Sequence, residues 1–152
     1  MLSAIIPTFN SQDDLQVLLA ALVPAAVDGL VREVICADAG STDATAVICE
    51  DAGAKLIAGG LVAAAEAARN ERLLILPADL RLAPGWEEGL GRKLNDLKGA
   101  VRIEGARLTG LLMGLRRPPC GLVVDRERVI GRTETRDAQA LIKALGLGAR
   151  RL

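Results

Sequence analysis

The chain has 152 residues, of which 51% are hydrophobic, so it can form one domain with a substantial core. Its aromatic residues are Phe9 and Trp86 alone, which argues against nucleic acid as a ligand, since single strands are usually held by stacking on aromatic rings. The formal net charge is zero, but residues 1–91 carry 5 Lys or Arg against 13 Asp or Glu, whereas residues 92–152 carry 14 against 6. The basic second half is interpreted either as solvated helix faces or as a surface for a phosphorylated or lipid-linked acceptor.

The cysteines and the apolar runs bear on the cellular compartment. Cys36, Cys49 and Cys120 are widely separated and lack the close spacing of a zinc site or a disulfide framework, which favours a reducing environment. Residues 1–7 do not resemble a signal peptide, and no run approaches the roughly 18 apolar residues of a membrane-spanning helix. We therefore expect a cytoplasmic protein, while peripheral contact with a membrane surface and homo-oligomerisation stay open.

The first half of the chain alternates apolar strands with helices. Strands are predicted at residues 2–6, 31–37, 55–57 and 73–76, with Pro7 ending the first of them. Helices are predicted from Ser11 or Asp13 to about residue 22, from 42 to 51, and from 60 to 68. This alternation is typical of an α/β fold with a parallel sheet.

The pattern weakens in the second half. A helix is predicted from Pro84 through residue 97, because proline is well tolerated in the first turn. Residues 100–103 and 122–124 have the composition of strands, residues 108–115 are ambiguous, and residues 137–145 form an amphipathic helical pattern that ends before Gly146.

Two acids follow predicted strands. Asp38 ends the second strand, and Gly40 and the capping residues Ser41, Thr42 and Asp43 come next. In a parallel sheet the carboxyl ends of the strands face the binding crevice, and a following helix offers free N–H groups to an anion. This geometry indicates a nucleotide site, although an ordinary strand-to-helix turn uses the same residue types.

A second acid, Asp79, follows the predicted strand at residues 73–76. The segments 3–10, 33–45 and 73–79, in this order and spacing, resemble the nucleotide-sugar half of family 2 glycosyltransferases. Residues 121–127 and Glu134, which precedes the last helical pattern, are similar to compact bacterial members of that family.

The resemblance implies a GT-A-type fold, a three-layer sandwich with a mostly parallel central sheet. It implies one domain over residues 1–152, with a nucleotide-sugar half at 1–86 and a shortened acceptor half at 87–152. It also implies transfer of a sugar from a nucleotide diphosphate donor to an unknown acceptor, with inversion at the anomeric carbon. The expected nucleotide-binding residues are Pro7, Thr8, Asn10, Asp38, Gly40, Ser41 and Asp43, with Asp38 as the acid that reads the base.

The resemblance assigns the remaining chemistry to two carboxylates. Asp79 matches the last acid of the family's Asp-x-Asp motif, which holds Mg²⁺ or Mn²⁺ against the diphosphate. Glu134 matches the late acid that activates the acceptor hydroxyl. The chain has no histidine, so any proton transfer must use a carboxylate.

Several positions depart from the family pattern. Pro77 stands where the first acid of Asp-x-Asp is expected, Ala39 replaces another acid, and Pro118 and Pro119 occupy positions on the acceptor side. The alternative is therefore a catalytically degenerate relative that acts as a nucleotide-binding or partner subunit. A nucleotidyltransferase is ranked lower, because residues 7–11 contain no Lys or Arg for a phosphate loop.

Overall fold

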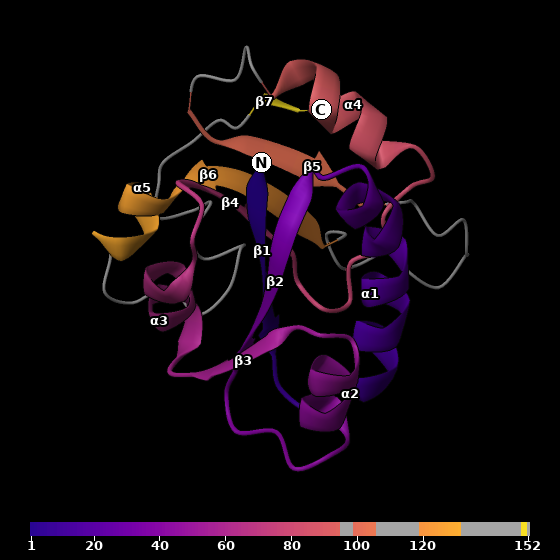
Figure 1. The fold of residues 1–152 in the computed structure, drawn as a ribbon, viewed down its shortest axis with the longest axis vertical. Coiled ribbons are helices and arrows are strands. Elements are labelled where there is room, and N and C mark those ends of the chain that lie inside the picture. The colour runs from indigo at the N-terminus through magenta and orange to yellow at the C-terminus, as the bar shows by residue number, and fades with distance from the viewer. Residues whose placement is uncertain (95–98, 106–118, 132–149, 152) are drawn as a thin grey trace.

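The computed structural model describes residues 1–94, 99–105, 119–131 and 150–151, and Figure 1 shows their arrangement. The elements in chain order are β1 (Leu2–Thr8), α1 (Gln12–Val27), β2 (Val31–Asp38), α2 (Thr45–Asp51), β3 (Lys55–Ala58), α3 (Gly60–Ala67), β4 (Arg72–Ile75), α4 (Trp86–Lys93), β5 (Val101–Glu104), β6 (Cys120–Asp125), α5 (Arg126–Ile130) and β7 (Arg150–Arg151). The strands form one sheet in the order β3-β2-β1-β4-β6-β5-β7. Among the described strands only β6 is antiparallel to its neighbours, so the sheet is mostly parallel, as predicted.

Helices cover both faces of the sheet. One apolar cluster joins alternate residues of β1, such as Ala4 and Ile6, to the inner faces of α1 and α4. The other joins the intervening residues, such as Ile5, to α3 and α5. Since successive strand residues point to opposite faces, this division produces three layers with α1, α2 and α4 on one side (Figure 1).

Pro7 lies inside β1 instead of ending it, so the prediction that it stops the strand is wrong. The oxygen of Ile5 accepts a hydrogen bond from Leu76 on the β4 side, and that of Thr8 accepts one from Ala39 on the β2 side. Alternation along the strand places the nitrogen of Pro7 on the β4 side, where pairing has already ended. The missing N–H of proline therefore removes no ladder hydrogen bond.

The helices differ from the predicted boundaries. Helix α1 continues through Pro24 to Val27, five residues beyond its predicted end. Helix α2 begins three residues late, at Thr45, because the preceding backbone N–H groups of residues 42 and 44 donate to side chains of another loop, those of Asn10 and Gln12. Helix α5 and strand β7 were not predicted. The predicted strands at residues 31–37, 55–57, 73–76, 100–103 and 122–124 are all present within one or two residues.

Helix α4 connects to α1 through the one tryptophan of the chain. The Trp86 indole N–H donates to the carbonyl of Ala21 over 3.2 Å.

The described residues contain no helix long and apolar enough to span the bilayer. The three cysteines are buried and form no disulfide bond with one another. Residues 108–115 and 137–145 lie outside the described part of the chain.

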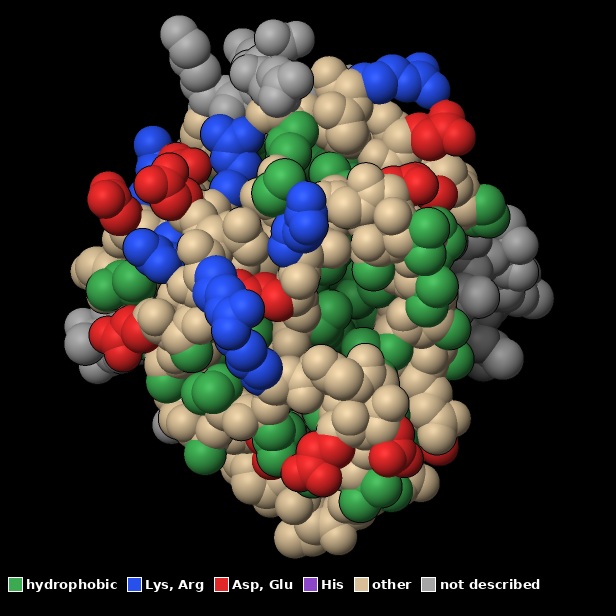
Figure 2. All heavy atoms as spheres, viewed as in Figure 1, with side chains coloured by type: hydrophobic (Ala, Val, Ile, Leu, Met, Phe, Trp, Pro, Cys, Tyr) green, Lys and Arg blue, Asp and Glu red, His purple; other side chains and the backbone are tan. Residues whose placement is uncertain are grey.

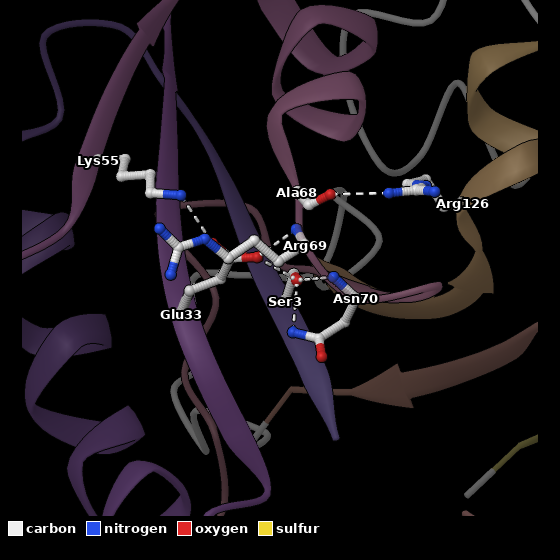
Figure 3. Close-up of polar contacts among 7 residues, drawn as sticks. All are labelled: Ser3, Glu33, Lys55, Ala68, Arg69, Asn70 and Arg126. Carbon is white, nitrogen blue, oxygen red and sulfur yellow. Dashed lines mark hydrogen bonds and ion pairs between the residues drawn. The ribbon is translucent and has the colours of Figure 1, made fainter.

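A polar network ties the strands together at their amino ends (Figure 3). Glu33 accepts hydrogen bonds from the Ser3 hydroxyl (2.7 Å), the Arg69 N–H (2.6 Å) and the Lys55 ammonium (2.9 Å). Ser3 in turn accepts from the backbone and side chain of Asn70. Burial opposes ionisation of Glu33, but these donors outweigh it and lower its pKa. This carboxylate is structural and belongs to the edge opposite the candidate site.

Candidate functional site

The candidate site is at the carboxyl ends of β1, β2 and β4. From β1 the chain passes to β2 and β3 on one side of the sheet, then returns to β4 on the other side of β1. The strand order therefore reverses between β1 and β4, which is where open α/β sheets bind ligands. Thr8 and Asp38 are paired at the ends of β1 and β2, and Asp79 follows β4. Both acids therefore lie at the carboxyl edge of the sheet.

Asp38 is the centre of the hydrogen bonding at this edge. Its Oδ1 accepts from the hydroxyls of Thr8 (2.9 Å) and Ser41 (2.6 Å). Its Oδ2 accepts from the backbone N–H groups of Gly40 (3.0 Å) and Ser41 (2.8 Å). A carboxylate has about four lone-pair sites. All of them are used inside the chain, so this carboxylate fixes the shape of the turn.

The pKa of Asp38 reflects these donors. Burial is the largest single influence and raises it, but the bonds from Ser41, Thr8 and Gly40 together lower the pKa below its ordinary value. The carboxylate is therefore ionised at neutral pH and below. Gly40 has φ of +95°, a conformation that glycine adopts without penalty and that directs its N–H toward Asp38.

The loop after β1 is bonded to the loop after β2. The Asn10 N–H donates to the Ser41 hydroxyl (2.9 Å), and the Asn10 side-chain oxygen accepts from the Thr42 N–H (2.8 Å). The Ser11 N–H donates to the Thr45 hydroxyl (2.9 Å). Asn10 has φ of +47°, which asparagine tolerates better than most residues. The two loops therefore form one rigid unit.

Asp43 and Gln12 complete this unit. Asp43 accepts from the N–H groups of Gln12 (3.3 Å) and Thr45 (3.0 Å), and these bonds, led by those from Thr45, lower its pKa. The Gln12 side chain accepts from the Ala44 N–H (3.2 Å). The N–H groups of residues 42, 44 and 45 are thus already paired. At these three positions the start of this helix therefore has no free N–H group for an anion.

Asp79, unlike Asp38, is exposed to solvent. It lies in a tight turn closed by the bond from the Leu80 N–H to the Pro77 carbonyl (3.0 Å). Among the described residues nothing donates a hydrogen bond to it. The same part of the chain holds no group of three or more acidic, histidine or cysteine side chains that could surround a metal ion. A cation here would have Asp79 as a single protein ligand.

Two further residues lie at this edge and were not predicted as site residues. Phe9, between Thr8 and Asn10, is 61% exposed. An exposed aromatic residue in a loop after a buried strand is a signal that the sequence already contained. Arg81, two residues after Asp79, forms an ion pair with Asp14 of α1. Glu134 lies outside the described residues, so its predicted role is not tested.

Comparison with known proteins gives a family and a fold. Residues 3–103 match the family described as Glycosyl transferase family 2. The structure resembles glucosyl-3-phosphoglycerate synthase from Mycobacterium tuberculosis in complex with Mn²⁺, UDP and glucosyl-3-phosphoglycerate, with 22% identity and a TM-score of 0.61. It resembles the same enzyme with Mn²⁺, UDP and phosphoglyceric acid (20%, 0.62) and with Mg²⁺ and UDP (21%, 0.60). A comparison with curated proteins finds no match.

The extent of these matches sets what they establish. They cover 84% of this chain but only 56–57% of the synthase, so the chain spans little more than half the length of these structures. At this identity they establish the fold, and they confirm the predicted GT-A architecture with its mostly parallel sheet. The three sequence segments that carry the resemblance, at 3–10, 33–45 and 73–79, all lie inside the matched range.

Proposed function

The chain belongs to glycosyl transferase family 2, and on that premise we propose that it transfers a sugar from a nucleotide diphosphate donor to an acceptor hydroxyl, with inversion at the anomeric carbon. One observation carries the proposal: the rigid pair of loops after β1 and β2 stands beside Asp79 at the strand-order reversal. In this proposal the paired loops would support the nucleoside, and Asp79, which follows β4, would supply a carboxylate. A diphosphate sugar needs both kinds of contact.

In this proposal the nucleoside binds against the paired loops. Pro7, Thr8 and Asn10 supply one wall, and the Asp38–Asp43 turn supplies the other through Gly40, Ser41 and Asp43. The exposed Phe9 ring offers a face on which a base can stack. For Asp38 to accept a bond from a base N–H, the hydroxyl of Thr8 or Ser41 must give up its place on Oδ1. Both hydroxyls can rotate, so this exchange needs no backbone movement.

Asp79 is the residue proposed to hold a divalent cation. The synthase structures contain Mn²⁺ or Mg²⁺ together with UDP. Here Asp79 presents an exposed carboxylate to which none of the described residues donates, and the side chain of Pro77 offers no ligand atom. Mg²⁺ commonly takes one or two carboxylates and fills its other positions with phosphate oxygens and water. One carboxylate therefore fits, and the cation would neutralise charge that develops on the departing diphosphate.

The acceptor side is proposed from the resemblance. Residues 1–86 would form the donor half and residues 87–152 the acceptor half, with Glu134 activating the acceptor hydroxyl. We propose that the protein works in the cytoplasm, where three buried thiols would remain reduced.

Titration calorimetry with UDP-, GDP- and TDP-sugars in the presence of Mn²⁺ tests the donor proposal. We expect one donor family to bind in the micromolar to millimolar range, and binding of none at millimolar concentration contradicts the proposal. Hydrolysis or transfer of the bound donor is then measured for the wild type and for Asp79→Ala. Turnover that disappears in Asp79→Ala supports transferase activity, whereas binding without any turnover identifies a degenerate nucleotide-binding protein.

A further inference from the structure

The basic residues of the first half are unevenly placed. Residues 1–91 contain five Lys or Arg. Four of them lie at or before the first residues of strands, at the amino edge of the sheet: Arg32, Lys55, Arg69 and Arg72. The fifth, Arg81, follows β4 at the carboxyl edge. Within this half, Arg81 is thus the one cation on the same edge as Asp38, Asp43 and Asp79.

Arg81 is only partly engaged there. One of its terminal nitrogens, Nη2, donates to Asp14 in the first turn of α1. The other, Nη1, is buried and has no hydrogen-bond partner within the described residues. A buried donor without a partner costs free energy, and a water molecule or an ion that binds to it is one explanation for such a group in a native protein. Within the described residues, the guanidinium therefore has an N–H group without an acceptor, and it lies beside the proposed nucleotide-sugar site.

We propose that Arg81 binds the diphosphate of the nucleotide donor and that Asp14 competes with the phosphates for it. A guanidinium matches phosphate oxygens with two parallel bonds, and such charge-assisted bonds are among the strongest in proteins. The pair with Asp14 is half exposed, with side chains 32% and 45% accessible, and pairs of this kind contribute little to stability. A diphosphate carries more charge than one carboxylate, so it can draw the guanidinium away and give Nη1 an acceptor.

This inference rests on the proposed function, because it concerns the phosphates of the same donor. Its test compares UDP with uridine, which shares the base and the ribose but lacks the phosphates. In Arg81→Gln we expect UDP to bind about tenfold to a hundredfold more weakly, while uridine affinity stays unchanged. Arg81→Lys, which keeps the charge but loses the planar fork, should recover part of the loss. Arg32→Gln removes the same charge at the opposite edge and should change neither affinity.

Asp14→Asn provides a change in the opposite direction. Since it removes the competing carboxylate, UDP should bind more tightly while uridine binds as before. A purely structural Arg81–Asp14 pair would instead weaken both ligands in both variants. If the wild type binds UDP but Arg81→Gln keeps the same ratio of UDP to uridine affinity, the inference is wrong and the proposed function stands. If the wild type binds neither ligand, nor any nucleotide sugar, both fail.

Discussion

The Asp38 carboxylate shapes a turn, and in the proposed function it would also read the nucleotide base. Its four donors come from the end of β1, at position 8, and from the loop after β2, at positions 40 and 41. A residue that reads a ligand after first ordering its own loop presents a fixed acceptor, which favours specificity. The same bonds make its charge part of the stability of the fold.

Asp38→Asn should destabilise the protein by about 1–2 kcal/mol near neutral pH, because an amide cannot accept at both of its terminal atoms. The pKa of Asp38 is lower in the folded protein than in the unfolded chain. Its contribution is therefore complete above the unfolded value of about 3.9 and is lost as the pH falls through the lower folded value. Urea unfolding at several pH values should show the difference from wild type shrinking below about pH 4.

Glu33→Gln is the matched control for this prediction. Glu33 is also a carboxylate with several donors and a lowered pKa, but it lies at the amino edge of the sheet (Figure 3). The Glu33→Gln variant should lose about as much stability as Asp38→Asn, with the same pH dependence. Nucleotide affinity should fall in Asp38→Asn and remain unchanged in Glu33→Gln. Equal loss of affinity in both variants would mean that Asp38 acts only through stability.

The sequence identified the residue types of the site better than their bonds. Asp38, Gly40 and Ser41 could be selected because a buried strand ends there in a glycine turn. The partners of the next N–H groups, at residues 42 and 44, could not be predicted, because their acceptors on Asn10 and Gln12 lie more than 30 positions away. Capping preferences assume that a capping side chain accepts from an N–H group of its own helix. Here side chains of the loop after β1 accept from N–H groups before α2 instead.

At the scale of the elements, prediction succeeded where the sequence contains an apolar run and failed where the outcome depends on a neighbouring element. Strands β1, β2 and β4 were found because each contains a short run of buried apolar residues. Pro7 was misjudged because its effect depends on which side of β1 its missing N–H faces, and that follows from where β4 stops pairing. The short helix α5 has only five residues, too few for a periodic pattern to appear.

Gly121 gives a test of the contact between β6 and β4. A Cβ at this position would lie 2.6 Å from Leu76 Cδ2 and 3.2 Å from the Ile75 carbonyl oxygen. Gly121→Ala should therefore destabilise the protein by about 1–3 kcal/mol through overpacking. Gly89→Ala in helix α4 meets nothing within 4 Å, and it should stabilise by up to about 1 kcal/mol because alanine favours helix. Chemical denaturation of both variants measures the contrast, and equal effects would contradict the close approach.

On the scale of the whole molecule, the basic side chains of the first half of the chain lie mostly at the amino edge of the sheet, and several acidic ones lie at the carboxyl edge. Figure 2 shows acidic but no basic side chains at the lower end of the face drawn, where Figure 1 places the loop that follows β2. The total composition hides this, because the net charge is zero. The sequence shows an acidic first half of the chain and a basic second half. Because most strands are parallel, part of this uneven charge becomes a difference between the carboxyl edge and the amino edge of the sheet. Strand order, which no local pattern specifies, was needed for that step.

This separation predicts that donor binding depends on a divalent cation. The carboxyl edge carries Asp14, Asp38, Asp43 and Asp79 near the proposed diphosphate, and in the first half of the chain Arg81 alone offsets them. Such an edge repels a diphosphate, and the repulsion is weakly screened where water is excluded. Chelation with EDTA should therefore reduce the preference for UDP over uridine by roughly tenfold or more, which corresponds to about 1.4 kcal/mol.

Calorimetric titrations of UDP and uridine, each with Mn²⁺ and with EDTA, measure this dependence. Uridine is the internal control, because it has no phosphate for the cation to bridge and its affinity should not respond to Mn²⁺. The gain with UDP should disappear in Asp79→Ala, the variant that lacks the exposed carboxylate. A UDP affinity that is the same with and without Mn²⁺ would show that Arg81 and the backbone suffice, and Asp79 would then be only a surface acid in a turn.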